Sequence, residues 1–412
     1  MPAQIDGIDL VPLAPGRLLP PRAFVSPVVF DAEEAAIWGR GWVHVADVAD
    51  LREPGDYVAA TIGQTPVVIL QARDGGGLRG FVNACRHRGA QLVEGKGRCE
   101  KQLRCPYHGW SYGHDGRLIG VPFREEFDWS AERAADAQRR HAGAAGEGEA
   151  REGALFDWSA ERAADGGDCD QTTLGLLPVR VGTVGPLVFA SLDPQAPPLE
   201  TWTGTLAADF VAAGVDTWPL AWELTYEVEA NWKIFVENAN DGYHIPVVHD
   251  VLTDLLQPGS GTTTIEAHGA YSWANINPNY VPPGEDPALA RIRFGCIFPN
   301  LIPVLSPVDL TYIRVDPVAP DRLRLFVRSY DEPARGKPLR ELRRQAFERT
   351  TDQDIGVVKK VHRGLRAAGL PAGIHARQLE ARIGHFEQLW VDAMARSLAG
   401  QRPGQAALAV VR

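Results

Sequence analysis

The 412-residue chain has only two methionines and five cysteines, and no apolar run approaches the length of a membrane-spanning helix. Residues 1–6 lack the basic and apolar regions of a secretory signal. Positive charge is also scarce, because 42 Lys and Arg against 52 Asp and Glu give a net charge of -10, which argues against nucleic acid or an anionic membrane as a partner. We therefore expect a cytoplasmic globular protein, long enough for two domains.

Two of the five cysteines lie in a pair of short arms that each combine one Cys with one His. The arms are Cys85-Arg86-His87-Arg88-Gly89 and Cys105-Pro106-Tyr107-His108-Gly109, a C-x-H-x17-C-x2-H spacing. Two thiolates and two imidazoles are the ligands of a Rieske 2Fe-2S cluster. Structural zinc is the alternative, but zinc fingers usually group Cys with Cys and His with His. The mixed arms, each followed by a glycine, favour a cluster bound by Cys85, His87, Cys105 and His108.

The other cysteines, Cys99, Cys169 and Cys296, are scattered along the chain. In a cytoplasmic protein we expect such thiols to be reduced and structural.

Residues 231–249 bring two histidines and two carboxylates into one short stretch. Two His and one carboxylate on one side of an iron are typical of Fe(II) oxygenases. The alternative is a helix whose polar residues lie near a core. On a helix Asp241 and His244 would share a face, whereas His244 and His249 would diverge, so we expect Pro246 to bend the chain and turn both imidazoles toward one metal. A cluster and an iron site together predict an oxygenase.

With these two cassettes the chain resembles the large (alpha) subunits of Rieske non-heme iron oxygenases, the ring-hydroxylating dioxygenase and monooxygenase family. The resemblance covers nearly the whole chain and includes residues 39–42, 53–57, 83–89 and 237–249. It implies a terminal oxygenase component in which a partner reductase, with or without a ferredoxin, reduces the Rieske cluster. Electrons then reach a mononuclear Fe(II) that activates O2 for hydroxylation, dihydroxylation or oxidative dealkylation of a small, aromatic or largely apolar substrate.

The resemblance also implies a third iron ligand far downstream, an Asp. At the matching place, residues 352–365, it assigns Asp354 as the metal ligand beside His244 and His249, with Asp352 as a reserve candidate. Two departures from the family pattern occur here. Gln353 stands where an acidic residue often precedes the ligand, and His362, where Gln is usual, is expected at the helix surface or at an interface.

In the family, the carboxylate matching Asp241 hydrogen-bonds the iron-site His, here His244, and a cluster His across a subunit boundary, here His108 of the partner subunit. The resemblance therefore makes Asp241 a catalytic bridge and not a ligand. Such a connection favours a head-to-tail ring, a homotrimer. The alternative is a Rieske electron-transfer protein with a non-catalytic second domain, although such carriers are short chains with no need of His244, His249 and Asp354.

Short apolar runs at 57–62, 66–70 and 78–82 predict a small all-β domain. Downstream, strands at 179–181, 187–192, 222–229, 291–299, 309–315 and 322–330 and helices at 206–213, 339–367 and 378–399 predict an antiparallel sheet packed by helices, and thus an α+β fold. We expect an N-terminal segment 1–38 packing on the catalytic domain, a Rieske domain 39–125, an inserted segment 126–173 and a catalytic iron domain 174–412.

The inserted segment contains a duplication, since residues 127–136 recur without change as 156–165. The residues between the copies are rich in Ala, Gly, Glu and Arg and too polar for a core. We interpret the segment as a local duplication at a tolerant surface site, with a partner-docking arm as the alternative.

The family's substrate pocket runs along strands that here carry apolar residues, although ordinary sheet core is the alternative for each. They are Phe294, Phe298, Leu301, Ile302, Val304 and Leu305. Arg291 or Arg293 could pair with a substrate carboxylate, but arginines at the surface of a strand are common.

Overall fold

The computed structural model describes residues 3–129, 174–249, 263–276 and 292–400. The chain forms two compact units. The small unit contains residues 45–182 and 188–194, and the large unit contains residues 1–44, 183–187 and 195–412. The small unit is built of strands and the large unit combines an antiparallel sheet with helices, so the predicted α+β fold is confirmed.

The strands of the small unit belong to a seven-stranded sheet, in the order β3-β12-β11-β6-β5-β4-β7, and to a three-stranded sheet, β10-β9-β8. Their bounds are β3 Val43–Asp47, β4 Asp56–Ile62, β5 Thr65–Gln71, β6 Leu78–Val82, β7 Lys96–Arg98, β8 Leu103–Arg104, β9 Ser111–Tyr112, β10 Leu118–Gly120, β11 Pro178–Val184 and β12 Leu187–Ser191. The three apolar runs predicted as strands form β4, β5 and β6. Their side chains build one core together with Cys85 and Cys105, which places both thiols out of water.

The core of the small unit also includes a residue of the inserted segment. Trp129, in the first copy of the duplication, is buried among Trp110, Tyr112 and Leu176. The expectation that the insert lies on the surface is therefore wrong for Trp129, because its indole ring is packed into the core. The second copy and Cys169 lie outside the described residues.

The large unit contains a seven-stranded antiparallel sheet in the order β13-β19-β18-β17-β16-β15-β14. The strands are β13 Leu220–Val228, β14 Thr263–His268, β15 Tyr271–Ile276, β16 Ile292–Ile297, β17 Leu301–Leu305, β18 Asp309–Ala319 and β19 Arg322–Asp331. The register places Val304, Thr311 and Ser329 opposite one another on neighbouring strands, so these side chains share one face.

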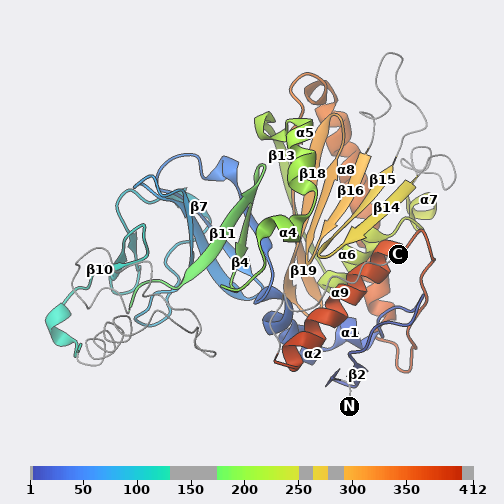
Figure 1. The fold of residues 1–412 in the computed structure, drawn as a ribbon, viewed down its shortest axis with the longest axis horizontal. Coiled ribbons are helices and arrows are strands. Elements are labelled where there is room, and N and C mark those ends of the chain that lie inside the picture. The colour runs from blue at the N-terminus through green and yellow to red at the C-terminus, as the bar shows by residue number, and fades with distance from the viewer. Residues whose placement is uncertain (1–2, 130–173, 250–262, 277–291, 401–412) are drawn as a thin grey trace, which may run out of the picture. The chain divides into compact units, whose positions relative to one another are not determined.

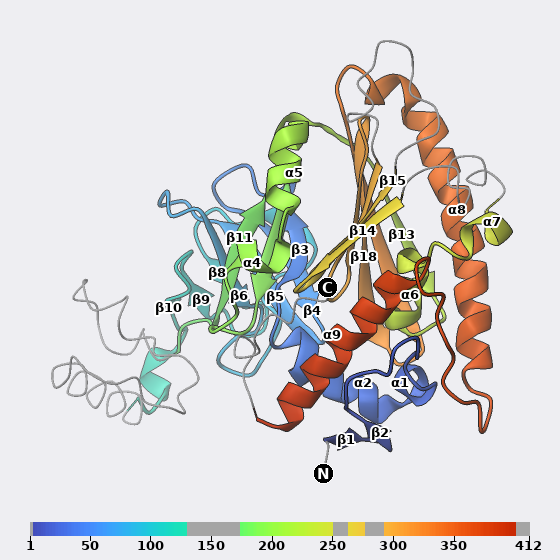
Figure 2. The same ribbon diagram turned by 45° about the vertical axis from the view of Figure 1, so that its right-hand side comes forward.

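Three helices pack against that face, as Figures 1 and 2 show: α6 Trp232–Asn240, α8 Gly336–Gly364 and α9 Ala381–Leu398. The predicted helices at 339–367 and 378–399 correspond to α8 and α9 with shifted ends. The remaining elements are β1 Gln4–Ile5, β2 Ile8–Asp9, α1 Arg22–Val25, α2 Pro27–Glu33, η1 Glu34–Trp38, η2 Val48–Asp50, η3 Arg124–Glu126, α4 Leu199–Thr203, α5 Leu206–Ala213, η5 Val215–Thr217 and α7 Ile245–Val248. No helix in the described ranges is long and apolar enough to cross a membrane.

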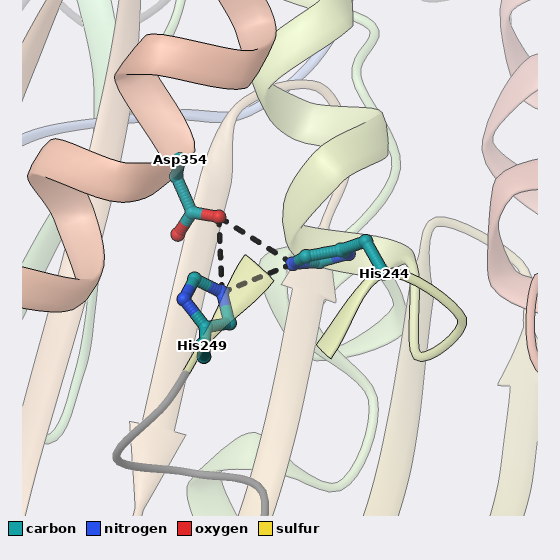
Figure 3. A group of neighbouring side chains, drawn as sticks. All are labelled: His244, His249 and Asp354. Atoms are coloured by element: carbon teal, nitrogen blue, oxygen red, sulfur yellow. Dashed lines mark hydrogen bonds and ion pairs between the residues drawn. The ribbon is translucent and has the colours of Figure 1, made fainter. Parts of the chain in front are cut away.

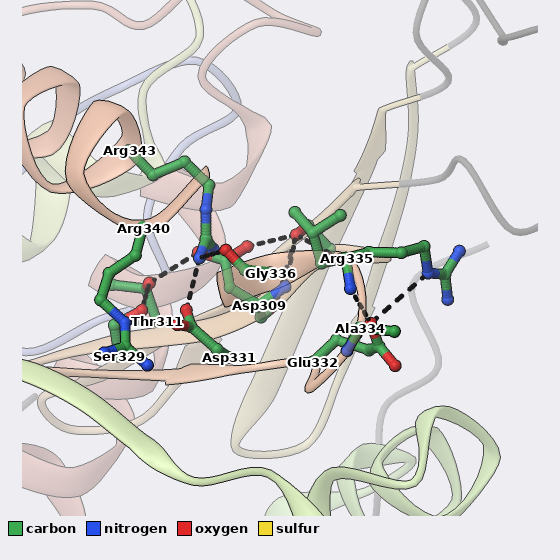
Figure 4. A network of polar contacts seen from close by, with 12 residues as sticks. Asp309, Thr311, Ser329, Asp331, Glu332, Ala334, Arg335, Gly336, Arg340 and Arg343 are labelled. Atoms are coloured by element: carbon green, nitrogen blue, oxygen red, sulfur yellow. Dashed lines mark hydrogen bonds and ion pairs between the residues drawn. The ribbon is translucent and has the colours of Figure 1, made fainter. Parts of the chain in front are cut away.

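The N-terminal part of α8 is fixed to the sheet by a polar network (Figure 4). Asp331, fully buried at the end of β19, accepts hydrogen bonds from Arg343 and, at 2.6 Å, from Arg340 Nε. Arg343 also pairs with Asp309 at 2.7 Å. Thr311 donates to Asp309 at 3.0 Å. These bonds hold the start of the helix that carries Asp354 further along.

The C-terminal part of α8 is fixed by His362, which is 3% exposed. Its Nδ1 accepts the backbone N–H of Asn231 at 3.4 Å, and its Nε2 lies 3.0 Å from Arg366 Nη2. The expected position at the helix surface or at an interface is therefore wrong. His362 is on the side of α8 that faces the start of α6, where it satisfies an unpaired helix N–H.

A buried carboxylate joins the N-terminal segment to the helices of the large unit. Glu33 in α2 accepts hydrogen bonds from Lys233 Nζ at 2.5 Å, Trp390 Nε1 at 2.7 Å and Trp232 Nε1 at 2.8 Å. Glu33 and Lys233 are both fully buried. Burial lowers the pKa of Lys233, although Glu33 opposes this shift. The three bonds connect α2 with α6 and α9.

A second buried carboxyl group predicts how stability depends on pH. Burial raises the pKa of Glu387 in α9 to about 7 from 4.5, even though the backbone N–H of Leu19 donates to its Oε1 at 2.9 Å. The folded protein thus keeps a proton that the unfolded chain releases between about pH 4.5 and 7, so the free energy of unfolding falls as pH rises through that window.

We expect Glu387→Gln to reduce this pH-dependent decrease in the free energy of unfolding by on the order of 2 kcal/mol, because a glutamine cannot ionise. Denaturant unfolding at pH 5 and pH 8 measures the decrease. Glu341→Gln, at an exposed carboxylate of α8, is the control. An unchanged pH dependence in the Glu387 variant would contradict the prediction.

Candidate metal centres

The two Cys and His arms of the small unit fold into matching turns. In the first arm Cys85 N–H donates to Ala90 O at 2.8 Å and Gly89 N–H donates to Cys85 O at 2.8 Å. The second arm repeats both bonds, from Cys105 N–H to Trp110 O at 2.7 Å and from Gly109 N–H to Cys105 O at 3.1 Å. Gly89 and Gly109 have φ values of 72° and 76°, a left-handed conformation that favours glycine.

These turns bring the four donor side chains together. The rings of His87 and His108 lie 4.7 Å apart between centroids, and each of the two thiols is 3% exposed. The Tyr112 hydroxyl lies 3.3 Å from Cys85 Sγ. Burial raises the pKa of the Cys85 thiol.

Within the described residues, the buried Nδ1 of His87 has no hydrogen-bond partner. A buried polar atom without a partner is costly unless a bound group satisfies it. Two buried thiols beside two imidazoles, one of them with such an atom, fit a 2Fe-2S cluster with mixed ligation.

In the large unit, His244, His249 and Asp354 converge from three places, as Figure 3 shows. Asp354 Oδ1 lies 3.4 Å from His244 Nε2 and 3.2 Å from His249 Nε2, and the two Nε2 atoms are 3.2 Å apart. Two imidazole nitrogens and one carboxylate oxygen are the donors of a facial site for ferrous iron. The reserve candidate, Asp352, is exposed on α8 and is not part of this group.

The imidazoles and carboxylates of this group shift one another's pKa values toward the charged forms. Burial alone would lower the pKa of His244, but hydrogen bonds to Asp241 and Asp354 outweigh it and raise the pKa to about 9. Burial would raise the pKa of Asp354, but its bonds to His244 and His249 lower it. Asp354 is therefore a carboxylate at neutral pH, the form that binds a cation.

The backbone reaches this geometry differently from the expectation of one bent helix. Helix α6 ends at Asn240, and Asp241 is extended, so Asp241 and His244 do not share a helical face. Instead Asp241 Oδ1 accepts the backbone N–H groups of Tyr243 and, at 3.3 Å, of His244, which forms a turn. Pro246 does not bend a helix either. It lies in the first turn of the short helix α7, a position that tolerates proline, and His244 and His249 stand at the two ends of this helix.

Three polar side chains support the candidate ligands. Asp241 Oδ2 lies 3.0 Å from His244 Nδ1, as expected of a residue that orients this imidazole. Gln353 Oε1 lies 3.0 Å from His249 Nδ1, and Asn238 hydrogen-bonds Asp354. The roles of Gln353 and Asn238 were not predicted from the sequence. The signal for Gln353 was its place beside Asp354, where it departs from the family pattern.

The strand residues expected along the substrate pocket divide into two groups. Phe298, Leu301, Ile302 and Leu305 are buried, as sheet core would be. Phe294 and Val304 are only partly buried and face each other on neighbouring strands β16 and β17. They lie on the sheet face shared with Thr311, against which α6, α8 and α9 pack.

Of the two arginines considered for a substrate carboxylate, Arg293 is engaged elsewhere. Arg293 pairs with Asp209 and, at 3.6 Å, with Glu266, and its guanidinium lies 4.5 Å from the centre of the Trp273 ring. Because side chains alternate along a strand, Arg293 points away from the face of Phe294. Arg291 lies outside the described residues. In the described part of the chain, Cys99 and Cys296 are buried, unpaired thiols.

Two family models match the chain. Residues 41–131 match the Rieske [2Fe-2S] domain, and residues 215–396 match the catalytic domain of the ring hydroxylating alpha subunit. Biphenyl dioxygenase subunit alpha from Paraburkholderia xenovorans is 29% identical over 55% of this chain and 44% of its own length. Choline monooxygenase from Spinacia oleracea is 27% identical over 89% and 76%, respectively. The chain thus spans less than half the length of some curated relatives that it matches.

Solved structures share the fold. A quaternary ammonium Rieske monooxygenase in complex with L-carnitine has a TM-score of 0.70 at 23% identity, covering 92% of this chain and 96% of that one. Naphthalene 1,2-dioxygenase from Rhodococcus sp., bound to indole, has a TM-score of 0.67 at 21% identity, covering 92% and 94%.

A Rieske domain and an alpha-subunit catalytic domain in one chain define the class of two-domain proteins that carry a 2Fe-2S cluster and a mononuclear non-heme iron. The chain belongs to the family of Rieske non-heme iron oxygenase alpha subunits. Members of this family are oxygenase components that work with reductase or ferredoxin partners and assemble as multimers.

Proposed function

We propose that this protein is the terminal oxygenase component of a multicomponent system. Cys85, His87, Cys105 and His108 would hold the Rieske cluster, and His244, His249 and Asp354 would hold Fe(II). The observation that carries the proposal is the convergence of His244, His249 and Asp354, in the same chain as two matching Cys and His arms. When bound, the cluster and the ferrous ion supply electron transfer and dioxygen activation.

The protein's own residues orient the two imidazoles of the proposed iron site. Asp241 lies 3.0 Å from His244 Nδ1, so the Nδ1 proton stays directed at this carboxylate, and a bound cation would displace the proton on Nε2 and use that nitrogen as its ligand atom. Gln353 fixes His249 Nδ1 in the same way at 3.0 Å. Asp241 would in addition reach His108 of the partner subunit in a head-to-tail homotrimer, which makes it the bridge between one cluster and a neighbour's iron site.

The proposed substrate is a small organic molecule with an aromatic or largely apolar body. Phe294 and Val304, partly buried and opposite each other, support this proposal. Relatives of the chain include a biphenyl dioxygenase, a choline monooxygenase and the carnitine monooxygenase oxygenase subunit of Escherichia coli, and the proposed reaction is hydroxylation, dihydroxylation or oxidative dealkylation. Oxygen uptake with a surrogate reductase, measured for aromatic and for quaternary ammonium candidates, separates the substrate classes.

We expect the purified protein to be brown, to give a Rieske-type EPR signal on reduction and to contain about three irons per chain, two from the cluster and one from the second site. His244→Ala should leave about two irons and an unchanged EPR signal but no substrate-dependent oxygen consumption, because only the mononuclear site loses a ligand. Metal analysis, EPR and oxygen electrode measurements check this.

A colourless protein that contains zinc would overturn the cluster assignment. Two irons per chain in the unmodified protein, with oxygen consumption absent, would instead favour an electron-transfer protein with a non-catalytic second domain.

A further inference from the structure

The cluster ligand His87 is enclosed by aromatic rings. Trp110 stacks on it with a centroid distance of 4.9 Å and an angle of 10° between the planes. Phe127 approaches the same ring edge-on at 5.8 Å and 79°. His108 lies at 4.7 Å. Phe127 is the first residue of the duplicated decapeptide, so the first copy begins with a residue that contacts a proposed cluster ligand.

The neighbours of Phe127 hold it in place. Its ring lies 5.7 Å from Trp110 and 5.6 Å from Trp129. Trp129 is 7% exposed, its Nε1 donates to Arg124 O at 3.0 Å, and the Arg124 guanidinium lies 5.2 Å from the centre of its ring. Aromatic pairs of this kind stabilise the packing beyond the burial of their surface.

The chain returns to the same pocket after residue 173. Gly175 O accepts a hydrogen bond from Arg86 Nη1 at 2.8 Å, and Arg86 directly precedes His87. Leu176, fully buried, donates its N–H to Gly116 O at 2.8 Å. The residues on both sides of 130–173 are therefore bonded into the core that surrounds the cluster ligands.

We propose that Phe127 is a positioning residue for His87, held by Trp110 and Trp129, and that it limits access of water to the His-ligated side of the cluster. The inference rests on the proposed Rieske cluster. Phe127 and the exposed Phe123 both line a hollow of about 820 Å³ that His87 and His108 share. Removing the Phe127 ring enlarges this hollow beside His87.

The consequence is a change in reduction potential. Reduction adds one electron and thus one negative charge to the cluster, and water stabilises the more highly charged state. Loss of the Phe127 ring is therefore expected to raise the reduction potential of the cluster and to alter the EPR g-values, because the His87 ring is no longer fixed.

The test compares Phe127→Ala with Phe123→Ala in the full chain, by a spectroscopic redox titration and EPR of the dithionite-reduced protein. Phe123 lines the same hollow but is 77% exposed, so it controls for the loss of an aromatic ring. We expect an upward shift of the potential and altered g-values for Phe127→Ala alone, and recovery of both in Phe127→Tyr. Should Phe127→Ala fail to retain the cluster, Phe127→Leu, which removes the aromatic ring but leaves a smaller apolar side chain, is expected to give an upward shift of smaller size.

An unchanged potential in Phe127→Ala or Phe127→Leu, or equal shifts in the Phe127 and Phe123 variants, would overturn the inference. A cluster missing from the unmodified protein would instead refute the proposed function, so the two failures are distinguishable.

Deletion of residues 137–165 tests whether Phe127 and Trp129 act without the rest of the insert. These 29 residues are one repeat unit, and their removal leaves one copy of the decapeptide in its place after Glu126. We expect soluble protein with unchanged iron content, potential and g-values, because Phe127 and Trp129 remain. If the deletion shifted the reduction potential as much as Phe127→Ala does, the deleted residues would control the potential, which would contradict the role of Phe127.

Discussion

Asp241→Asn is expected to lower turnover by roughly 100-fold or more while both metal sites stay occupied. The Asp241 carboxylate lies 3.0 Å from His244 Nδ1 and also accepts two backbone N–H groups of the turn that precedes the ligand. Asparagine keeps the volume and one acceptor oxygen, so the turn can form, but it removes the charge that stabilises His244 and the proposed link to His108 of the partner subunit.

The experiment measures steady-state turnover, iron content and the EPR signal of the reduced cluster in the same preparation. Asp352→Asn is a matched control, since it makes the same chemical change at an exposed carboxylate two residues from Asp354. The control should retain activity. If Asp241→Asn lost the mononuclear iron, Asp241 would be a ligand and the assignment of Asp354 would be in doubt.

Glu33→Ala is expected to lower the free energy of unfolding by about 3–5 kcal/mol, the usual cost of removing one partner of a buried ion pair. Lys233 would keep a buried ammonium group without its counter-charge, and the indole N–H groups of Trp232 and Trp390 would lose their acceptor. The substitution would remove the three hydrogen bonds that connect α2 with α6 and α9.

Denaturant unfolding at neutral pH checks this prediction, with Glu33→Gln and Asp31→Ala for comparison. Glu33→Gln keeps an acceptor oxygen without the charge and should lie between the two. Asp31 is an exposed acid of the same helix, so its replacement should cost little. A loss in Glu33→Ala no larger than that in Asp31→Ala would show that the bonds at Glu33 contribute little.

The sequence identified the features whose geometry is local. The Cys and His arms are short turns set by their own backbone hydrogen bonds and glycines, so spacing alone indicated the donors. Asp354 follows His249 by 105 residues. Only the family resemblance predicted it as a ligand, since no local pattern encodes which strand or helix faces another.

The predictions that proved wrong concern residues whose burial is decided by tertiary packing. His362 is buried because it lies on the side of α8 that faces the start of α6. Trp129 is buried because it packs into the core of the small unit. At the candidate iron site, a turn closed by the Asp241 side chain stands in place of the expected helix, because an Asp side chain readily offers the backbone this local alternative.

The position of Asp354 within α8 has a consequence for metal exchange. The helix spans 29 residues, about 44 Å, and Asp354 lies 18 residues after its first residue and 10 before its last. Both ends are held by groups that need no metal: Arg340 and Arg343 on Asp331 at one end, and His362 on Asn231 at the other. We therefore expect iron at the proposed site to leave and return without unwinding of the helix, so that occupancy of the site is separate from folding of the protein.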